Sequence, residues 1–168
     1  MRRAARPEPL AAGPGQESVW DYPRPPRLER TSALVEVALG GVTIVSTRRA
    51  QRVLETSHPP VYYLPIADFA PGSLRSARGR SFCEWKGTAA YFDVVAGSTI
   101  AESAAWGYPD PAPAFTAIVD HVAVYPSAMD RCTVDGEIVT PQPGHFYGGW
   151  VTSDVVGPFK GDPGSEFW

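Results

Sequence analysis

The sequence predicts a single, mainly β domain built from short antiparallel hairpins. The chain has 168 residues, about the length of one ordinary domain. Hydrophobic residues make up 43% of it and charged residues 20%, as in chains that fold. Its 18 prolines are about twice the average usage. Since proline interrupts helices and central strands alike, we expect short elements and many turns.

Residues 1–16 are predicted to be a flexible tail, followed by one domain over residues 17–168. The tail consists mostly of Arg, Ala, Pro and Gly, with almost no apolar side chain to pack. No apolar stretch follows its basic residues, so we do not expect a signal peptide. From about residue 141 the chain is rich in glycine and aromatic residues without periodicity, which indicates an irregular wrap around the domain.

Two related hairpin units are predicted. Residues 33–44 alternate apolar side chains around Gly40-Gly41, a pair that suits the positive φ angles of a tight turn. They align without gaps on residues 89–100, and residues 61–65 resemble residues 122–126. If these matches reflect a duplication, two sheet units pack across a pseudo-twofold axis with a shared cleft. Chance similarity between two glycine turns is the alternative.

The segments between these repeats favour further strands and turns. Residues 48–55 fit a strand better than a helical turn, and the two prolines in residues 56–60 predict a turn. Residues 132–139 predict another hairpin, with Asp135-Gly136 in a type I′ turn.

One short helix is predicted within residues 111–121. Pro113 suits a first helical turn, and Phe115, Ile118 and Val119 form a stripe at helical spacing.

Charge and cysteine content restrict the partners and the compartment. The net charge of −3 comes from well-mixed charges, which argues against nucleic acid. The sequence has no run of about 18 apolar residues, so we do not expect a membrane-spanning segment. Cys83 and Cys132 are too few for a disulfide framework, so we expect a cytoplasmic protein with reduced thiols. Whether two chains form a homodimer is left open.

No metal site or cofactor is expected from the motifs. Structural zinc needs about four Cys or His ligands in closely spaced pairs. The two cysteines and the three histidines are scattered singly. The sequence contains neither a Walker-type phosphate loop nor a G-x-S-x-G elbow.

Residues 83–87 hold the candidates for chemistry. Cys83 could act as a nucleophile if the nearby Lys86 ammonium favours its thiolate. A buried, inert cysteine is the favoured alternative. On a strand, Glu84 and Lys86 would share one face, opposite Cys83 and Trp85. There they could serve as acid and base, as polar anchors for a ligand, or only as a solvated charge pair.

Aromatic residues near turns are the candidates for a binding pocket. Rings in such settings can line a cleft, although most aromatic residues belong to cores. We therefore expect a module that binds an unknown small molecule, with an enzyme of unassigned reaction as the alternative. The expected ligand-binding residues are Tyr63, Trp85, Trp106, Tyr108, Glu84 and Lys86.

Four blocks, at residues 56–65, 83–87, 105–111 and 122–126, carry a family resemblance. From about residue 17 to residue 168 the chain resembles the bacterial and fungal family catalogued as domain of unknown function 427. The resemblance implies a compact fold of the β-tent or Mss-four-like group. That fold is shared by methionine sulfoxide reductases of the B type and the thalidomide-binding domain. Many β-tents carry two C-x-x-C pairs, which this sequence lacks, so a zinc-free variant is implied.

Some classifications attach a nucleotidyltransferase label to this family. Such a site needs paired carboxylates beyond a Gly-Ser to hold two magnesium ions. Gly97-Ser98 is followed at a suitable distance by Asp110 alone, so the residues do not support this activity.

Overall fold

The computed structural model describes residues 5–168, and the mainly β prediction is confirmed. Within these residues the helical elements are four short 3-10 helices. They are η1 (Val19–Asp21), η2 (Ile66–Asp68), η3 (Pro113–Ile118) and η4 (Pro126–Ala128). No helix of this part of the chain is long and apolar enough to cross a bilayer.

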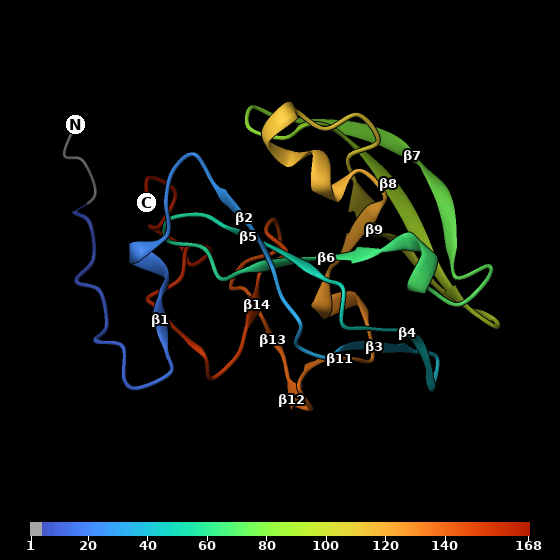
Figure 1. Ribbon diagram of the computed structural model, residues 1–168, viewed down its shortest axis with the longest axis horizontal. Helices are drawn as coiled ribbons and strands as arrows, with labels where there is room; N and C mark the ends of the chain where they lie inside the picture. The colour runs from blue at the N-terminus through green and yellow to red at the C-terminus, as the bar shows by residue number, and fades with distance from the viewer. Residues whose placement is uncertain (1–4) are drawn as a thin grey trace.

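A seven-stranded antiparallel sheet runs through the middle of the molecule (Figure 1). Its strands, in spatial order, are β2 (Arg27–Arg30), β5 (Gln51–Leu54), β6 (Val61–Pro65), β10 (His121–Val124), β9 (Thr99–Gly107), β8 (Gly87–Ala96) and β7 (Leu74–Cys83).

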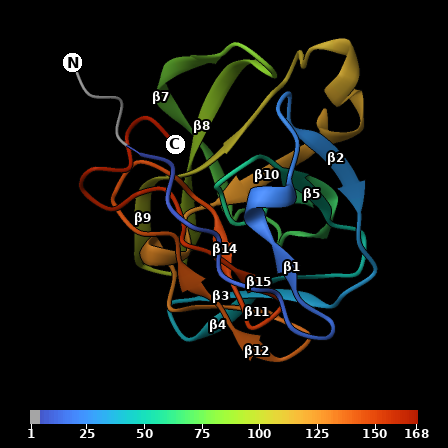
Figure 2. The same cartoon turned by 90° about the vertical axis from the view of Figure 1, so that its left-hand side faces the viewer.

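A four-stranded sheet lies below the larger one in Figure 1. It contains, in order, β12 (Glu137–Ile138), β11 (Arg131–Val134), β3 (Val35–Leu39) and β4 (Val42–Thr47). Two small pairs complete the fold, and Figure 2 shows the first of them beside η1. They are β1 (Glu17–Ser18) with β15 (Val155–Val156), and β13 (Thr140–Pro141) with β14 (Trp150–Val151).

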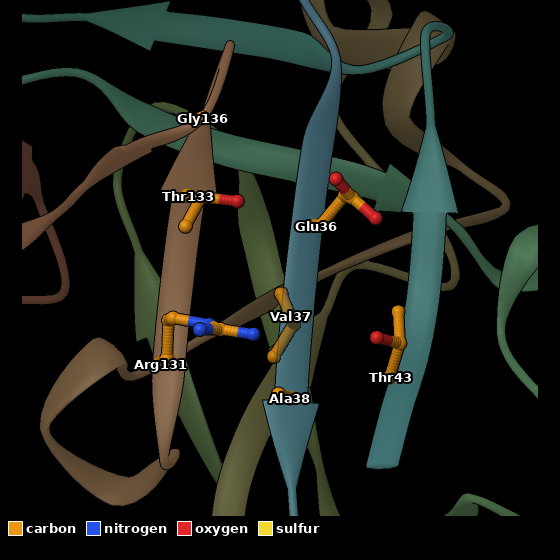
Figure 3. A pocket seen from close by; sticks show the side chains of 7 residues that line it. All are labelled: Glu36, Val37, Ala38, Thr43, Arg131, Thr133 and Gly136. Carbon is orange, nitrogen blue, oxygen red and sulfur yellow. The ribbon is translucent and has the colours of Figure 1, made fainter.

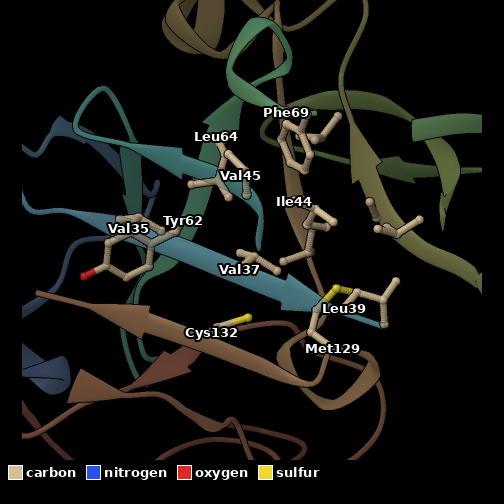
Figure 4. Close-up of a cluster of buried hydrophobic side chains, with 14 of the residues drawn as sticks. Val35, Val37, Leu39, Ile44, Val45, Tyr62, Leu64, Phe69, Met129 and Cys132 are labelled. Atoms are coloured by element: carbon tan, nitrogen blue, oxygen red, sulfur yellow. The ribbon is translucent and has the colours of Figure 1, made fainter. Parts of the chain in front are cut away.

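The main hydrophobic core fills the space between the two large sheets (Figure 4). Val35 and Val37 of β3 contribute from one side, and Tyr62 and Leu64 of β6 from the other. Since side chains alternate along a strand, Tyr63 of β6 points to the opposite face of the seven-stranded sheet. There it joins a second, aromatic cluster. The larger sheet is therefore buried on both faces along its centre.

Apart from the edge strand β7, the order of the strands is symmetric about the β6–β10 pair. Along the chain, β2, β5 and β6 run from the outside to the centre of one half, and β8, β9 and β10 do the same in the other. In the first half, the chain between β2 and β5 leaves the sheet and forms the β3–β4 hairpin. In the second half, β8 and β9 form a hairpin within the sheet. This arrangement agrees with the predicted pair of related hairpin units.

Both predicted hairpins are present, with glycine in each turn. Leu39 pairs with Val42 across Gly40-Gly41. Ala96 pairs with Thr99 across Gly97-Ser98.

The ungapped alignment of the two hairpins is wrong by one residue. It places Gly97 over Gly41, whereas the turns superpose Gly97 on Gly40. A shift of one residue exchanges the two faces of a strand, so the ungapped alignment matches inward-facing residues of one hairpin with outward-facing residues of the other. With the structural register Val37 corresponds to Val94, and both are buried in the same core.

The predicted helix in residues 111–121 is the 3-10 helix η3. Phe115 departs from helical geometry, with φ −115° and ψ 17°. Three prolines alternate with other residues from Pro109 to Pro113, and β10 begins at His121, so little length is left between them for an α-helix. Phe115 and Ile118 still bury their side chains, as the spacing predicted.

Most of the other element predictions are confirmed. Residues 48–55 contain strand β5, and residues 56–60 form a turn. Asp135 (φ 47°) and Gly136 (φ 83°) join β11 to β12 in the predicted turn.

The flexibility of the tail stays a prediction. Residues 1–4 lie outside the described residues, and residues 5–16 form no helix or strand. Within the latter, the Leu10 amide donates to the Gly157 carbonyl over 2.8 Å.

Candidate functional site

A cavity of about 370 Å³ lies on the aromatic face of the seven-stranded sheet. Its floor comes from β5, β6 and β9, and its walls from the end of the β7–β8 hairpin and from residues 142–148. The rings that line it are those of Tyr63, Tyr91, Trp106, Tyr108, Tyr125 and Tyr147. Phe82 and Phe146, 77% and 79% exposed, stand at its rim.

The structure brings five of the seven residues singled out from the sequence to this cavity. They are Tyr63, Cys83, Lys86, Trp106 and Tyr108. Trp85 is partly buried against the aromatic cluster, outside the cavity lining. Glu84 is exposed.

The prediction that Glu84 and Lys86 share a strand face is wrong. Cys83 pairs with Gly87 at the end of the β7–β8 hairpin, and residues 84–86 form the turn between them. Gly87, at φ 109°, allows the chain to reverse there. Within a turn the alternation of a strand does not apply, so Glu84 faces solvent while Lys86 is buried.

The aromatic wall is held by ring contacts and one hydrogen bond. The Trp106 Nε1–H donates to the Tyr63 hydroxyl over 3.3 Å. The Tyr125 ring centroid lies 4.5 Å from that of Trp106. Burial raises the pKa of Tyr63 and of Tyr108, so both phenols stay neutral and can donate hydrogen bonds.

The segment from Gln142 to Gly149 closes one side of the cavity. Gly148 packs so closely on the Trp106 ring that an added Cβ would overlap it. The Gln142 side chain anchors the segment, because its Oε1 accepts from the Gly149 amide over 3.0 Å and its Nε2 donates to the Lys160 carbonyl over 2.8 Å.

These anchors also determine the tautomer of His58. The two backbone partners fix the orientation of the Gln142 amide, so Nε2 donates to His58 Nδ1 over 3.0 Å. The ring proton therefore sits on Nε2, 3.5 Å from the Glu55 carboxylate. Burial, followed by the charges of Lys160, Arg24 and Lys86, lowers the pKa of His58 to about 3. His58 is thus a neutral, positioned side chain.

The two cysteines differ in their surroundings. Cys132 is buried in the main core, where desolvation raises its pKa to about 12. Cys83 is partly exposed and lines the cavity, without a hydrogen bond from its thiol to any residue of the described chain. Both ring nitrogens of His58 already have partners. Among residues 5–168, Cys83 therefore has no hydrogen-bonded base of the kind that activates a nucleophile.

Several cavity residues were missed from the sequence. They are Glu55, His58, Tyr91, Gln142 and Lys160. His58 lies within a block that carries the family resemblance, which is the signal that could have indicated it. Gln142 and Lys160 come from the irregular C-terminal segment, where no periodicity predicts which side chains turn inward.

Two other hollows have different surroundings. One of about 220 Å³ lies on the outer face of the four-stranded sheet, lined by Glu36, Thr43, Arg131 and Thr133 (Figure 3). The other, of about 250 Å³, lies beside Tyr108 and His121. Across residues 5–168 no group of three or more His, Cys, Asp or Glu side chains converges as metal ligands would.

Comparison with known proteins identifies the family. Proteins of curated function yield no match to the chain. A family model described as "Domain of unknown function (DUF427)" matches residues 27–135, from β2 through β11. The match spans both hairpin units, including β6, β9 and the β7–β8 turn, which contribute to the cavity. The chain therefore belongs to the DUF427 family.

Proposed function

We propose that the protein is a small-molecule-binding β module and that the aromatic cavity is its binding site. The observation that carries the proposal is the cavity itself. Its volume of about 370 Å³ is within the range of ligand pockets, roughly 300–1,000 Å³. Aromatic rings surround it, and a few polar groups, including Lys86 and the Glu55–His58 pair, converge on it.

The lining favours a ligand with a flat ring. Trp106 and Tyr125 lie ring against ring at 4.5 Å on one side, and Tyr147 lies edge-on to His58 at 4.7 Å on another. Flat apolar surfaces bury a planar ring with little loss of side-chain entropy. The neutral tyrosine hydroxyls can donate to acceptors on such a ligand.

The alternative, an enzyme that uses Cys83, has less support. A nucleophile needs a base within hydrogen-bonding reach, and Cys83 has none among the described residues. An enzyme that uses Glu84 and Lys86 as acid and base also has less support, because Glu84 is exposed in the turn whereas Lys86 is buried.

A thermal-shift screen tests the proposal. The library should contain cyclic amides, nucleobases and aromatic metabolites. A ligand at 100 times its Kd stabilises the folded chain by about 2.7 kcal/mol, which corresponds to a rise in Tm of roughly 5–10 °C for this size. Cys83→Phe fills the cavity and should abolish the rise. Thr133→Phe, which places the same ring in the hollow of Figure 3, should retain it.

Two outcomes would contradict the proposal. A screen in which no compound raises the Tm of the wild-type protein argues against a binding module. A compound that stabilises Cys83→Phe as much as wild type binds elsewhere, and the cavity is then not its site.

A further inference from the structure

The chain has only two lysines, Lys86 and Lys160, and both line the aromatic cavity. All its other basic residues, histidines aside, are arginines, and none of them lines the cavity. A lysine ammonium is a compact charge with three donors, whereas guanidinium is a planar fork. The cationic groups of the cavity thus differ in kind from those of the rest of the molecule.

Lys86 is held in the cavity wall by its backbone and its stem. Its carbonyl accepts from the Ala112 amide over 2.9 Å, which ties the β7–β8 turn to the segment before η3. Its Nζ lies 5.6 Å from the Tyr108 ring centroid and 5.9 Å from that of Phe115. The residue is only 9% exposed, so its aliphatic stem is packed within the wall, and its ammonium is reached through the cavity.

The Lys86 ammonium has no acidic partner within the protein. Among residues 5–168 no carboxylate lies within 4.0 Å of its Nζ, and no side-chain or backbone acceptor forms a hydrogen bond with it. Glu55, the carboxylate of the cavity, pairs instead with Arg24 at 3.4 Å and with His58 at 3.5 Å. The neighbouring rings attract the ammonium, but they provide no counter-charge.

Lys160 adds a second positive charge. Its Nζ donates to the Trp168 carbonyl over 3.3 Å and lies 5.6 Å from the Tyr147 ring centroid. The charges of Lys160 and Lys86 both contribute to the lowered pKa of His58. The cavity lining therefore holds two ammonium groups beside the one carboxylate of Glu55.

We propose that the ligand of this cavity is an aromatic carboxylate, with its anion on the Lys86 ammonium and its ring among Trp106, Tyr108 and Tyr125. The inference rests on the proposed binding function and specifies its ligand class. A carboxylate fits better than a phosphate, because a phosphate site usually presents arginine forks or a series of backbone amides. Lys160 already donates to the Trp168 carbonyl, so Lys86 is the cavity ammonium without a hydrogen-bond partner among the described residues, and it matches one negative charge.

The test compares three probes of nearly the same shape by isothermal titration calorimetry: 2-naphthoate, 2-naphthamide and 2-naphthylmethylamine. On the wild-type protein we expect naphthoate to bind at least about tenfold more tightly than naphthamide, and naphthylmethylamine not to bind. Lys86→Met should weaken naphthoate by about tenfold or more and leave naphthamide unchanged. Lys86→Arg, which keeps the charge, should recover part of the loss. If Lys86→Met fails to fold by circular dichroism, the comparison of Lys86→Arg with Lys86→Gln replaces it.

The outcomes separate this inference from the binding function itself. If naphthoate and naphthamide bind equally, or if Lys86→Met binds naphthoate like wild type, the anion inference is overturned and the binding function stands. If the three probes fail and the thermal-shift screen yields only neutral or cationic ligands, the anion inference is likewise overturned. If neither experiment yields any ligand, both fail. An anionic ring from the screen that loses affinity with Lys86→Met supports the inference.

Discussion

His58 shows how one buried residue links the cavity to the pH dependence of folding. Its Nδ1 accepts from Gln142, its Nε2 faces Glu55, and its side chain is only 11% exposed. The folded protein therefore binds a proton on this ring only near pH 3, whereas the unfolded chain binds it near the ordinary histidine pKa of about 6.5.

The free energy of unfolding is predicted to fall as the pH drops from about 6.5. Above that pH the ring is neutral in both states, so it adds no pH dependence. Below it the unfolded state takes up a proton that the native ring refuses until about pH 3, a slope of up to about 1.4 kcal/mol per pH unit. Urea unfolding between pH 7 and 4.5 should show this slope, and His58→Gln should reduce it.

Exposed His145 supplies the matched control. His145→Gln should leave the wild-type curve unchanged. His121, whose pKa burial also lowers, retains its own contribution in both variants. A His58→Gln curve parallel to that of wild type would contradict the neutral state of His58.

At the scale of elements, the sheet carries the cavity floor and irregular segments complete its walls. β6 and β9 place Tyr63 and Trp106 on the sheet, while the β7–β8 turn presents Lys86. The segment before β14 is held by Gln142 and by the contact of Gly148 with Trp106. Because sites depend on such segments for their shape, one added methyl group there should have a measurable effect.

Gly148→Ala is predicted to destabilise the protein by roughly 1–3 kcal/mol, the usual cost of overpacking, and to weaken ligand binding. The added Cβ overlaps the Trp106 ring, so residues 142–149 must move away from the cavity. Urea unfolding and calorimetry with the best ligand measure the two effects.

Gly13→Ala serves as the control, because its Cβ would meet only the side chain of partly exposed Gln16. It should leave stability and binding close to wild type. Wild-type behaviour of Gly148→Ala would mean that the close approach to Trp106 does not shape the site.

At the scale of the whole molecule, three hydrophobic clusters are arranged around the two sheets. One lies between the sheets, one beneath the cavity, and a third joins Val19, Trp20 and Tyr22 to Leu54 and Val155. The third cluster connects the start of the predicted domain to its irregular C-terminal segment.

Deletion of residues 1–16 is predicted to lower the free energy of unfolding by only about 1–2 kcal/mol. The described part of this tail is mostly exposed and contributes single contacts, such as the Leu10 amide to the Gly157 carbonyl, each worth about 1 kcal/mol. Deletion through residue 22 also removes the buried Val19, Trp20 and Tyr22 and should cost several kcal/mol or prevent folding. Urea unfolding distinguishes the two. Equal, large losses would place the tail within the domain.

The sequence by itself determined the elements whose signals are local. Alternating apolar residues predicted β3 and β4, and paired turn residues predicted the turns at Gly40-Gly41 and Asp135-Gly136. These inferences hold because strand alternation and positive φ depend on neighbouring residues alone.

Only the tertiary structure decided which side chains share the cavity. Lys86 and Lys160, separated by more than seventy positions, meet there because the β7–β8 turn and the C-terminal segment converge on the same face of the sheet. Glu84 and Lys86 part in a turn that a strand pattern does not reveal. His58 takes its tautomer from Gln142, which long-range backbone hydrogen bonds orient. Such contacts depend on chain segments brought together by folding, and no local periodicity encodes them.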